Sequence, residues 1–131
     1  MNTILLVDDN IELLRLYERI LSLKSKHMIA GRATSGEEAV RVYRDMIIKP
    51  DLVIMDVNMP GIDGITAARR IIKSDGKAKI MFATSEVINP DDIPVELSNA
   101  LVLRKPFTVN DFLCAIKAAS TLQVRARYAI A

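Results

Sequence analysis

Five polar side chains in this 131-residue sequence each follow or end a short apolar run. They are three carboxylates, one hydroxyl and one amine, contributed by Asp8, Asp9, Asp56, Thr84 and Lys105. If the apolar runs are neighbouring parallel strands, their carboxyl ends meet at one edge of a sheet and these groups converge there. Three carboxylates in one crevice repel, so one would take up a proton unless a cation joined them. A divalent cation together with the lysine would bring the sum of these charges to zero.

Hard carboxylate oxygens are the ligands that Mg²⁺ prefers, so we expect Mg²⁺ rather than zinc at this edge. No cluster of histidine and cysteine competes for a metal, since the sequence holds one of each, His27 and Cys114. A metal-bound pocket without net charge suits phosphoryl transfer. Asp56 is the predicted nucleophile because carboxylates can form aspartyl-phosphates. Lys105 would supply a positive charge to the phosphoryl oxygens and Thr84 a hydroxyl donor.

The elements that must position these groups follow from the hydrophobic pattern. Five short, mostly continuous apolar runs are typical of strands buried on both faces of a parallel sheet. They cover residues 3–7, 28–33, 52–55, 79–83 and 101–103. Helical patterns alternate with them, so the sequence predicts five βα units, a doubly wound α/β sheet with helices on both faces.

Capping residues mark the starts of the predicted helices. Asp9 or Asn10 can cap the first helix, Ser35 the second and Thr108 the last. Ser35 is followed three residues later by Glu38, which is the spacing of a capping box.

Two predicted helices have uncertain ends. The second carries an apolar stripe from Ala39 to Ile47 and is expected to stop at Lys49-Pro50. The fourth is expected to be short or distorted, over about residues 91–98, because Pro90 and Pro94 interrupt it.

Composition excludes several classes of protein. The net charge is +2 and no long run of lysine and arginine occurs, so nothing indicates binding to nucleic acid. The first apolar run is interrupted by two acids, which excludes a signal peptide and a membrane span. One cysteine cannot form an internal disulfide, in keeping with a reducing compartment. We expect one cytoplasmic domain over residues 1–122, and a tail over 123–131 that extends the last helix.

Each candidate site residue also has a purely structural interpretation. Asp8-Asp9 and Asp56 can be turn or cap residues, and Thr84 can cap the fourth helix. Lys105 can be a solvated lysine before a turn. Cys114 and the six methionines are interpreted as core residues. Only the coincidence of the acids, the hydroxyl and the amine on one predicted edge favours a functional site.

Four motifs, in order and at these spacings, resemble the receiver domains of two-component response regulators, including the single-domain form found in chemotaxis. The resemblance covers about residues 3–120. The motifs are Ile4-Leu-Leu-Val-Asp8-Asp9, Pro50-Asp-Leu-Val-Ile-Met-Asp56-Val-Asn-Met-Pro60-Gly-Ile-Asp-Gly64, Ile80-Met-Phe-Ala-Thr84-Ser85 and Lys105-Pro-Phe107.

The resemblance implies a flavodoxin-like fold with strand order 2-1-3-4-5. It implies that Asp56 accepts a phosphoryl group from a sensor histidine kinase. Asp9 and Asp56 would bind Mg²⁺ directly, together with the backbone carbonyl of Asn58, and Asp8 would act mainly through a water. Thr84 and Lys105 would contact the phosphoryl group.

The resemblance further implies a cis peptide bond between Lys105 and Pro106. Such a domain is a signalling protein rather than an enzyme, although it can promote its own phosphorylation and dephosphorylation. Its phosphorylation switches a face that docks on a downstream protein, and we expect a monomer or a weak dimer. The target, the cognate kinase and the stimulus cannot be read from the sequence. The chain either docks on a partner or is a fragment of a longer protein.

Two positions depart from the family pattern. An aromatic residue that rotates inward on activation usually stands three residues before the lysine, and here that position is Val102. The residue after the threonine is usually alanine, and here it is Ser85. Both departures fall in the region that normally carries the signal outward, so the output face is expected to be unusual.

Three rival functions fit these residues less well. A small-molecule phosphatase would usually carry a second acid two residues after the nucleophile, where this chain has Asn58. An interaction module that is never phosphorylated would not need the full set of acids with Thr84 and Lys105. A nucleotide-binding domain would need a glycine-rich first loop, which is absent. No helix-turn-helix or basic face indicates DNA binding.

Overall fold

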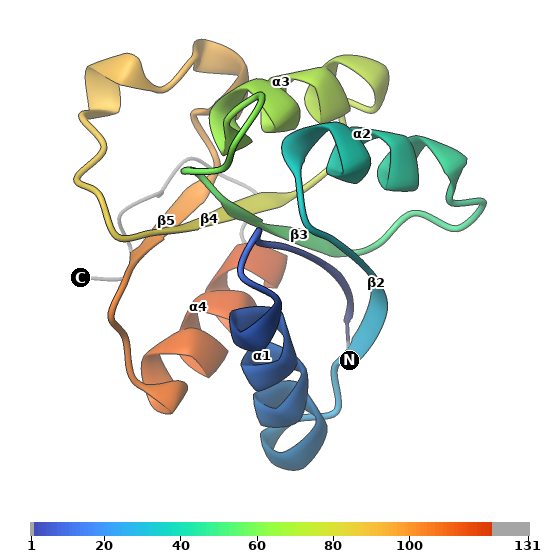
Figure 1. Cartoon of the computed structure of the whole chain (residues 1–131), viewed down its shortest axis with the longest axis vertical. Helices are drawn as coiled ribbons and strands as arrows, with labels where there is room; N and C mark the ends of the chain where they lie inside the picture. The colour runs from blue at the N-terminus through green and yellow to red at the C-terminus, as the bar shows by residue number, and fades with distance from the viewer. Residues whose placement is uncertain (1, 122–131) are drawn as a thin grey trace.

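Five parallel strands form one sheet in the order β2-β1-β3-β4-β5 in the computed structural model, which describes residues 2–121 (Figure 1). The predicted flavodoxin-like strand order is therefore confirmed. The strands are β1 (Thr3–Val7), β2 (Met28–Ala33), β3 (Leu52–Asp56), β4 (Ile80–Thr84) and β5 (Leu101–Arg104). All five lie where the sequence predicts them, and the last three each end one residue later than predicted.

Four α-helices cover the two faces of this sheet. Helices α1 (Ile11–Lys24) and α4 (Val109–Thr121) lie on one face, and α2 (Gly36–Asp45) and α3 (Gly64–Ser74) lie on the other (Figure 1). Each face has its own hydrophobic core. None of the described helices is long and apolar enough to cross a membrane.

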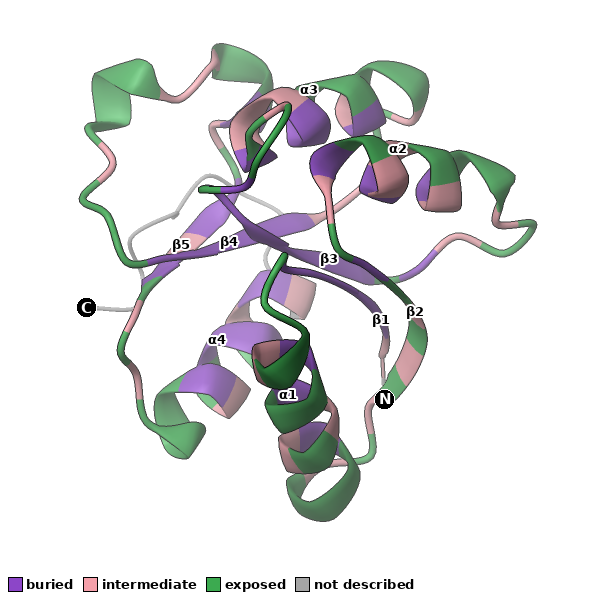
Figure 2. Ribbon diagram, in the orientation of Figure 1, coloured by how far each residue is buried: buried purple, intermediate pink, exposed green. Residues whose placement is uncertain are grey.

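Burial differs between the centre and the edges of the sheet (Figure 2). Strands β3 and β4 are buried along their whole length, as the continuous apolar runs predict. Strand β2 instead alternates between exposed and half-buried residues until its last residue, the buried Ala33, because it is an edge strand with only β1 beside it. The prediction of burial on both faces is wrong for β2.

Side-chain caps fix where the helices begin. The Asn10 carboxamide accepts a hydrogen bond from the N–H of Leu13, so Asn10 rather than Asp9 caps α1. The Ser35 hydroxyl accepts from the N–H of Glu38 and caps α2. Thr108 and Asp111 accept from each other's N–H groups at the start of α4. The carboxylate of Asp9, the other residue that can cap α1, is therefore available to the site at the edge of the sheet.

Helix α2 is shorter than predicted. It ends at Asp45, and Met46 already has an extended backbone. The ammonium group of Lys49 donates to the carbonyls of Tyr43 and Arg44 at 2.6 and 3.0 Å, so it satisfies groups that a further helical turn would otherwise use. Ile47, predicted to belong to the apolar stripe, lies outside the helix and is 98% exposed.

No α-helix forms between β4 and β5 in the described chain. Two 3₁₀ turns, Pro90–Asp92 and Val95–Leu97, stand in its place. The expected short or distorted helix over 91–98 is therefore wrong in type, because Pro94 has no N–H to continue a helix begun at Pro90. Leu97 is buried and anchors this segment to the core that β3, α2 and α3 share.

Cys114 was expected in the core and is exposed on α4. Phe112, Ala115 and Ile116 occupy the buried face of the helix, and Cys114 points away from it. The methionines are also divided, since Met55 is fully buried whereas Met28 is largely exposed. The predicted tail over residues 123–131 and the domain boundary at 122 lie outside the described residues.

The first residue of α3, Gly64, lies against the backbone at the end of β3. Its N–H donates to the carbonyl of Val57 at 2.8 Å. A Cβ added to Gly64 would lie 2.0 Å from the carbonyl oxygen of Asp56. Asp63, the residue before it, caps α3 by accepting from the N–H of Thr66 at 2.8 Å. The sequence alone suggests a turn here, whereas the structure shows a contact that only glycine can make.

Gly64→Ala is expected to destabilise the protein by about 3 kcal/mol or more, because backbone atoms cannot move aside as a flexible side chain could. Urea unfolding measures the loss. Gly76→Ala is the matched control, since a Cβ there would meet nothing within 4 Å, and its effect should stay within about 0.5 kcal/mol. Equal stabilities for the two variants would show that the close approach at Gly64 is relieved at little cost.

Candidate functional site

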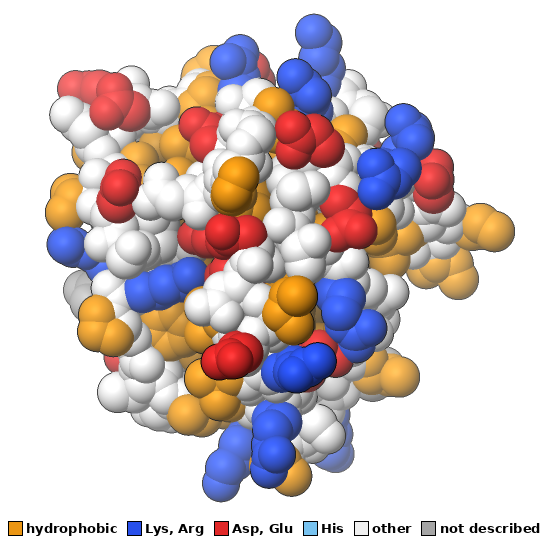
Figure 3. Space-filling view, in the orientation of Figure 1, with side chains coloured by type: hydrophobic (Ala, Val, Ile, Leu, Met, Phe, Trp, Pro, Cys, Tyr) orange, Lys and Arg blue, Asp and Glu red, His pale blue; other side chains and the backbone are white. Residues whose placement is uncertain are grey.

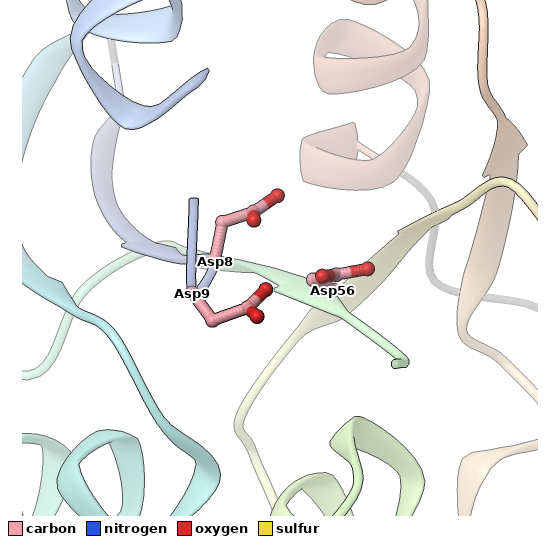
Figure 4. A group of neighbouring side chains, drawn as sticks. All are labelled: Asp8, Asp9 and Asp56. Atoms are coloured by element: carbon pink, nitrogen blue, oxygen red, sulfur yellow. The ribbon is translucent and has the colours of Figure 1, made fainter. Parts of the chain in front are cut away.

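Three carboxylates meet at the carboxyl edge of the sheet. Asp8 and Asp9 follow β1, and Asp56 is the last residue of β3. One oxygen from each lies within 4.8 Å of the others (Figure 4). Strands β1 and β3 are paired neighbours in register, from Ile4 with Leu52 to Val7 with Met55, and this pairing brings the carboxylates together.

Burial differs among the three acids. Asp8 and Asp56 are 2% and 7% exposed, whereas Asp9 is exposed to solvent. The Asp8 side chain points toward the face of the sheet that carries α1 and α4 (Figure 4). Its Oδ1 atom accepts a hydrogen bond from the N–H of Asn10 at 2.9 Å. The cluster thus combines two buried carboxylates with a third, that of Asp9, which an ion can reach from solvent.

Lys105 brings the compensating charge that the sequence led us to expect. Its Nζ atom lies 3.0 Å from Oδ2 of Asp8 and 3.6 Å from Oδ1 of Asp56. Its backbone N–H donates to the carbonyl of Thr84 at 2.8 Å, which ties the loop after β5 to the end of β4. The peptide bond between Lys105 and Pro106 is cis, as the family resemblance implies.

Thr84 ends β4 and is fully buried. Its hydroxyl oxygen accepts a hydrogen bond from the N–H of Glu86 at 3.1 Å, which leaves its own proton free to donate. No helix begins at this point of the described chain, so the alternative interpretation of Thr84 as a helix cap is wrong.

The electrostatics of the pocket favour the binding of a cation. Burial raises the pKa of Asp56 from 3.8 to about 6, and the charges of Asp8 and Asp9 add to the rise. Lys105 and a hydrogen bond from the backbone of Asn58 act in the opposite direction without overcoming it. Three carboxylates and one ammonium carry two negative charges in excess, which a divalent ion would balance.

This donor set suits Mg²⁺. The three side chains offer hard carboxylate oxygens, no described histidine or cysteine joins the cluster, and the excess charge equals that of one divalent ion. An acidic triad of this kind is typical of a magnesium site.

Sequence reasoning missed one residue near this pocket. Tyr17 fits the helical spacing of an apolar face with Leu14 and Leu21, and its ring stacks with Phe107 and Phe112 between α1 and α4. Phe107 follows Lys105 by two residues, so this aromatic cluster lies next to the loop that carries the lysine. Helical spacing predicts that Tyr17 is buried, but no local pattern predicts which loop its ring meets.

A family model, the response regulator receiver domain, matches residues 4–117. Among relatives, the chemotaxis protein CheY of Thermotoga maritima is 39% identical over 82 residues, which cover 63% of this chain and 66% of that protein. The response regulator GacA of Pseudomonas viridiflava is 38% identical over 98 residues, 74% of this chain but 44% of that protein. The matched regions thus span less than two thirds of the length of either relative.

Solved structures of response regulators are also similar to this chain. The response regulator TrrA of Thermotoga maritima, crystallised in complex with Mg²⁺ and BeF, is 29% identical with a TM-score of 0.76, covering 91% of this chain and 99% of that one. A LuxR-family regulator from Aurantimonas is also 29% identical, with a TM-score of 0.75 over 90% of this chain and 84% of that one. With the sheet order, the acidic pocket and the lysine beside it, these matches show that the chain belongs to the response regulator receiver domain family.

Proposed function

We propose that this protein receives a phosphoryl group on Asp56 from a sensor histidine kinase, in a reaction that requires Mg²⁺, and that the modification switches a protein-docking face. The observation that carries the proposal is the meeting of Asp8, Asp9 and Asp56 with the ammonium group of Lys105. Such a pocket binds a divalent ion and a dianionic phosphoryl group at the same place.

The proposed ligands of Mg²⁺ are Asp9, Asp56 and the backbone carbonyl of Asn58, with Asp8 acting through a water. Asp9 is exposed and can exchange water for metal readily, whereas Asp8 is buried and bonded to Asn10 and Lys105. When bound, the ion would neutralise the negative charge shared by the acceptor carboxylate and the incoming phosphoryl oxygens.

In the proposed reaction, an oxygen of Asp56 forms a bond to phosphorus while the bond from phosphorus to the imidazole nitrogen of a phosphohistidine breaks. The electron pair of that bond returns to the imidazole. Asp56 must be ionised to attack, so its raised pKa makes a bound cation important for reactivity near neutral pH. Lys105 and Thr84 are placed to donate hydrogen bonds to the phosphoryl oxygens that Asp56 does not contribute.

The docking face is proposed to comprise the two 3₁₀ turns, β5 and α4. Val102, the residue at the usual position of the rotating aromatic ring, is half-buried on β5 and packs against the core under α3. No ring stands there to rotate, so we propose that the 3₁₀ segment, anchored by Leu97, carries the signal. The downstream partner is a protein rather than DNA, the location is cytoplasmic, and the domain acts as a monomer or weak dimer.

The rival interpretations are less well supported. Receiver domains are phospho-accepting signalling proteins rather than enzymes that turn over a substrate, and the position two residues after Asp56 holds an amide in place of a second acid. An interaction module that is never phosphorylated gives no reason for two buried carboxylates to lie beside a single lysine with negative charge in excess.

Wild-type protein incubated with Mg²⁺ and acetyl phosphate is expected to gain one phosphoryl group, which intact-mass spectrometry detects. Asp56→Asn should gain none, because an amide oxygen does not attack phosphorus. The control is Asp45→Asn, which removes an exposed carboxylate at the end of α2 and should leave the modification unchanged. Equal labelling of Asp56→Asn and wild type would refute the proposed acceptor.

Lys105→Gln is expected to separate metal binding from phosphoryl transfer. Removing the ammonium group 3.6 Å from Asp56 lowers the positive charge that repels Mg²⁺, so the metal should bind more tightly. The rate of phosphorylation by acetyl phosphate should fall on the order of 100-fold, because one donor to the developing charge is lost. Isothermal titration and a labelling time course measure the two effects. A variant that loses Mg²⁺ affinity would show that Lys105 only holds the acids in place.

The pKa of Asp56 predicts how stability depends on pH in the absence of metal. The folded state holds the Asp56 proton up to about pH 6, whereas the unfolded state releases it near 3.8. The contribution of Asp56 to stability is therefore highest below pH 4 and falls as the pH rises through 6, by at most about 3 kcal/mol. Asp56→Asn should then be more stable than wild type in urea at about pH 7.5, and the difference should vanish at about pH 4.

Millimolar Mg²⁺ provides the companion measurement. It should stabilise wild type at about pH 7.5 and have a much smaller effect on Asp56→Asn, because the variant lacks one ligand. If the two proteins differed in stability by the same amount at both pH values, a raised pKa of Asp56 would not be the cause.

A further inference from the structure

The hydroxyl group of Tyr17 is buried and has no hydrogen-bond partner among the described residues. The side chain is 3% exposed, and no other described side chain has a buried polar atom left unpaired in this way. A phenylalanine would fill almost the same space without bringing a polar group out of water. A buried hydroxyl at this position therefore needs a partner, either a nearby acceptor or a trapped water.

The position of Tyr17 directs its ring toward the acidic pocket. Side chains on an α-helix lean back toward the helix N-terminus, and α1 starts directly after the Asp8–Asn10 segment. The Tyr17 ring stacks on Phe112 of α4 at 4.9 Å and on Phe107 at 6.1 Å between centroids. It thus lies between α1 and α4, on the face of the sheet toward which Asp8 points (Figure 4).

The charges of the pocket reach this hydroxyl. Burial raises the pKa of Tyr17, and the negative charges of Asp8 and then Asp56 raise it further. The phenol therefore keeps its proton throughout the neutral range and can only act as a neutral donor or acceptor.

Asp8 has the capacity to accept one more hydrogen bond. Its Oδ1 atom accepts from the N–H of Asn10, and its Oδ2 atom accepts from the ammonium of Lys105. A carboxylate offers about four lone-pair positions, so two stay open after these bonds. Once Lys105 turns to a phosphoryl group on Asp56, the buried Asp8 charge loses its strongest partner.

We propose that Tyr17 is a positioning residue of the phosphorylation site, which donates its hydroxyl proton toward Asp8 through one buried water. The bond holds the Asp8 carboxylate in place while Lys105 is shared between Asp8 and Asp56. It also links α1 to the acidic pocket, on the face of the sheet opposite α2 and α3. This role in phosphorylation rests on the proposed function, whereas the hydrogen bond itself does not.

A double-mutant cycle on the metal-free protein tests the bond. Tyr17→Phe should lower the ratio of folded to unfolded protein about fivefold in urea at neutral pH. In an Asp8→Ala background, which removes the acceptor, the same substitution should have little effect. A Tyr17→Phe variant as stable as wild type or more so, or one with the same loss in both backgrounds, would overturn the proposal.

Tyr43→Phe is the matched control. It removes the hydrogen bond of 2.6 Å that the Tyr43 hydroxyl donates to Asp75, on the other face of the sheet, so its cost should be the same with and without Asp8. The comparison separates a specific bond to Asp8 from a general effect of losing a tyrosine hydroxyl.

Spectroscopy and labelling connect the bond to the site. The chain has three tyrosines and no tryptophan, so tyrosine emission can be read directly. Mg²⁺ with beryllofluoride should change the emission of wild type and of Tyr43→Phe but not of Tyr17→Phe. Labelling of Tyr17→Phe by acetyl phosphate should be several-fold slower. If wild type is never labelled, the proposed function fails, while the double-mutant cycle still shows whether the hydrogen bond exists. If wild type is labelled, but Tyr17→Phe is labelled at the same rate and the cycle is additive, only this inference is overturned.

Discussion

Three carboxylates crowded at the carboxyl edge of a parallel sheet can be held together only by positive charge, and the rest of this site follows from that constraint. Lys105 lies within 4 Å of two of them, yet two negative charges remain in excess. Burial prevents water from screening the repulsion, so the pKa of Asp56 rises to about 6. The folded chain therefore contains a site whose charge is balanced only when a divalent ion binds.

The scaffold satisfies this constraint through the sheet order. Placing β1 and β3 side by side brings Asp8 and Asp9 next to Asp56, and β4 and β5 then add Thr84 and Lys105 from the same edge. Gly64 lets α3 start directly against the backbone of Asp56, which fixes the acceptor from the α3 side. The Tyr17 cluster fills the opposite side, between α1 and α4. The acceptor strand is thus held by close packing from both faces.

The surface that would report phosphorylation has less regular structure than the site. Figure 3 shows acidic, basic and apolar side chains interspersed on the face drawn there, without one dominant charged patch. The segment between β4 and β5 carries four acids, two prolines and exposed valines at positions 87 and 95, and it has no basic residue. This segment, with its two 3₁₀ turns, contacts the core through the buried Leu97 and the partly buried Ile88 and Ile93, so it is held by a few side chains rather than by a regular helix.

The sequence by itself determined the five strands, the caps at Ser35 and Thr108, the choice of Asp9 or Asn10 as the first cap, and the identity of the charged groups that gather at one edge. These are local signals, because a strand's apolar run and a cap's side chain act within a few residues. Only the tertiary structure decided that Cys114 is exposed, that α2 ends at Asp45 and that β2 is exposed on its outer side. It also showed that Gly64 lies against the backbone of Asp56, that the Tyr17 ring stacks on Phe107 and Phe112, and how far the pKa of Asp56 rises. Those properties depend on which distant residues come into contact and how much water they exclude, and neither quantity is encoded in a local pattern.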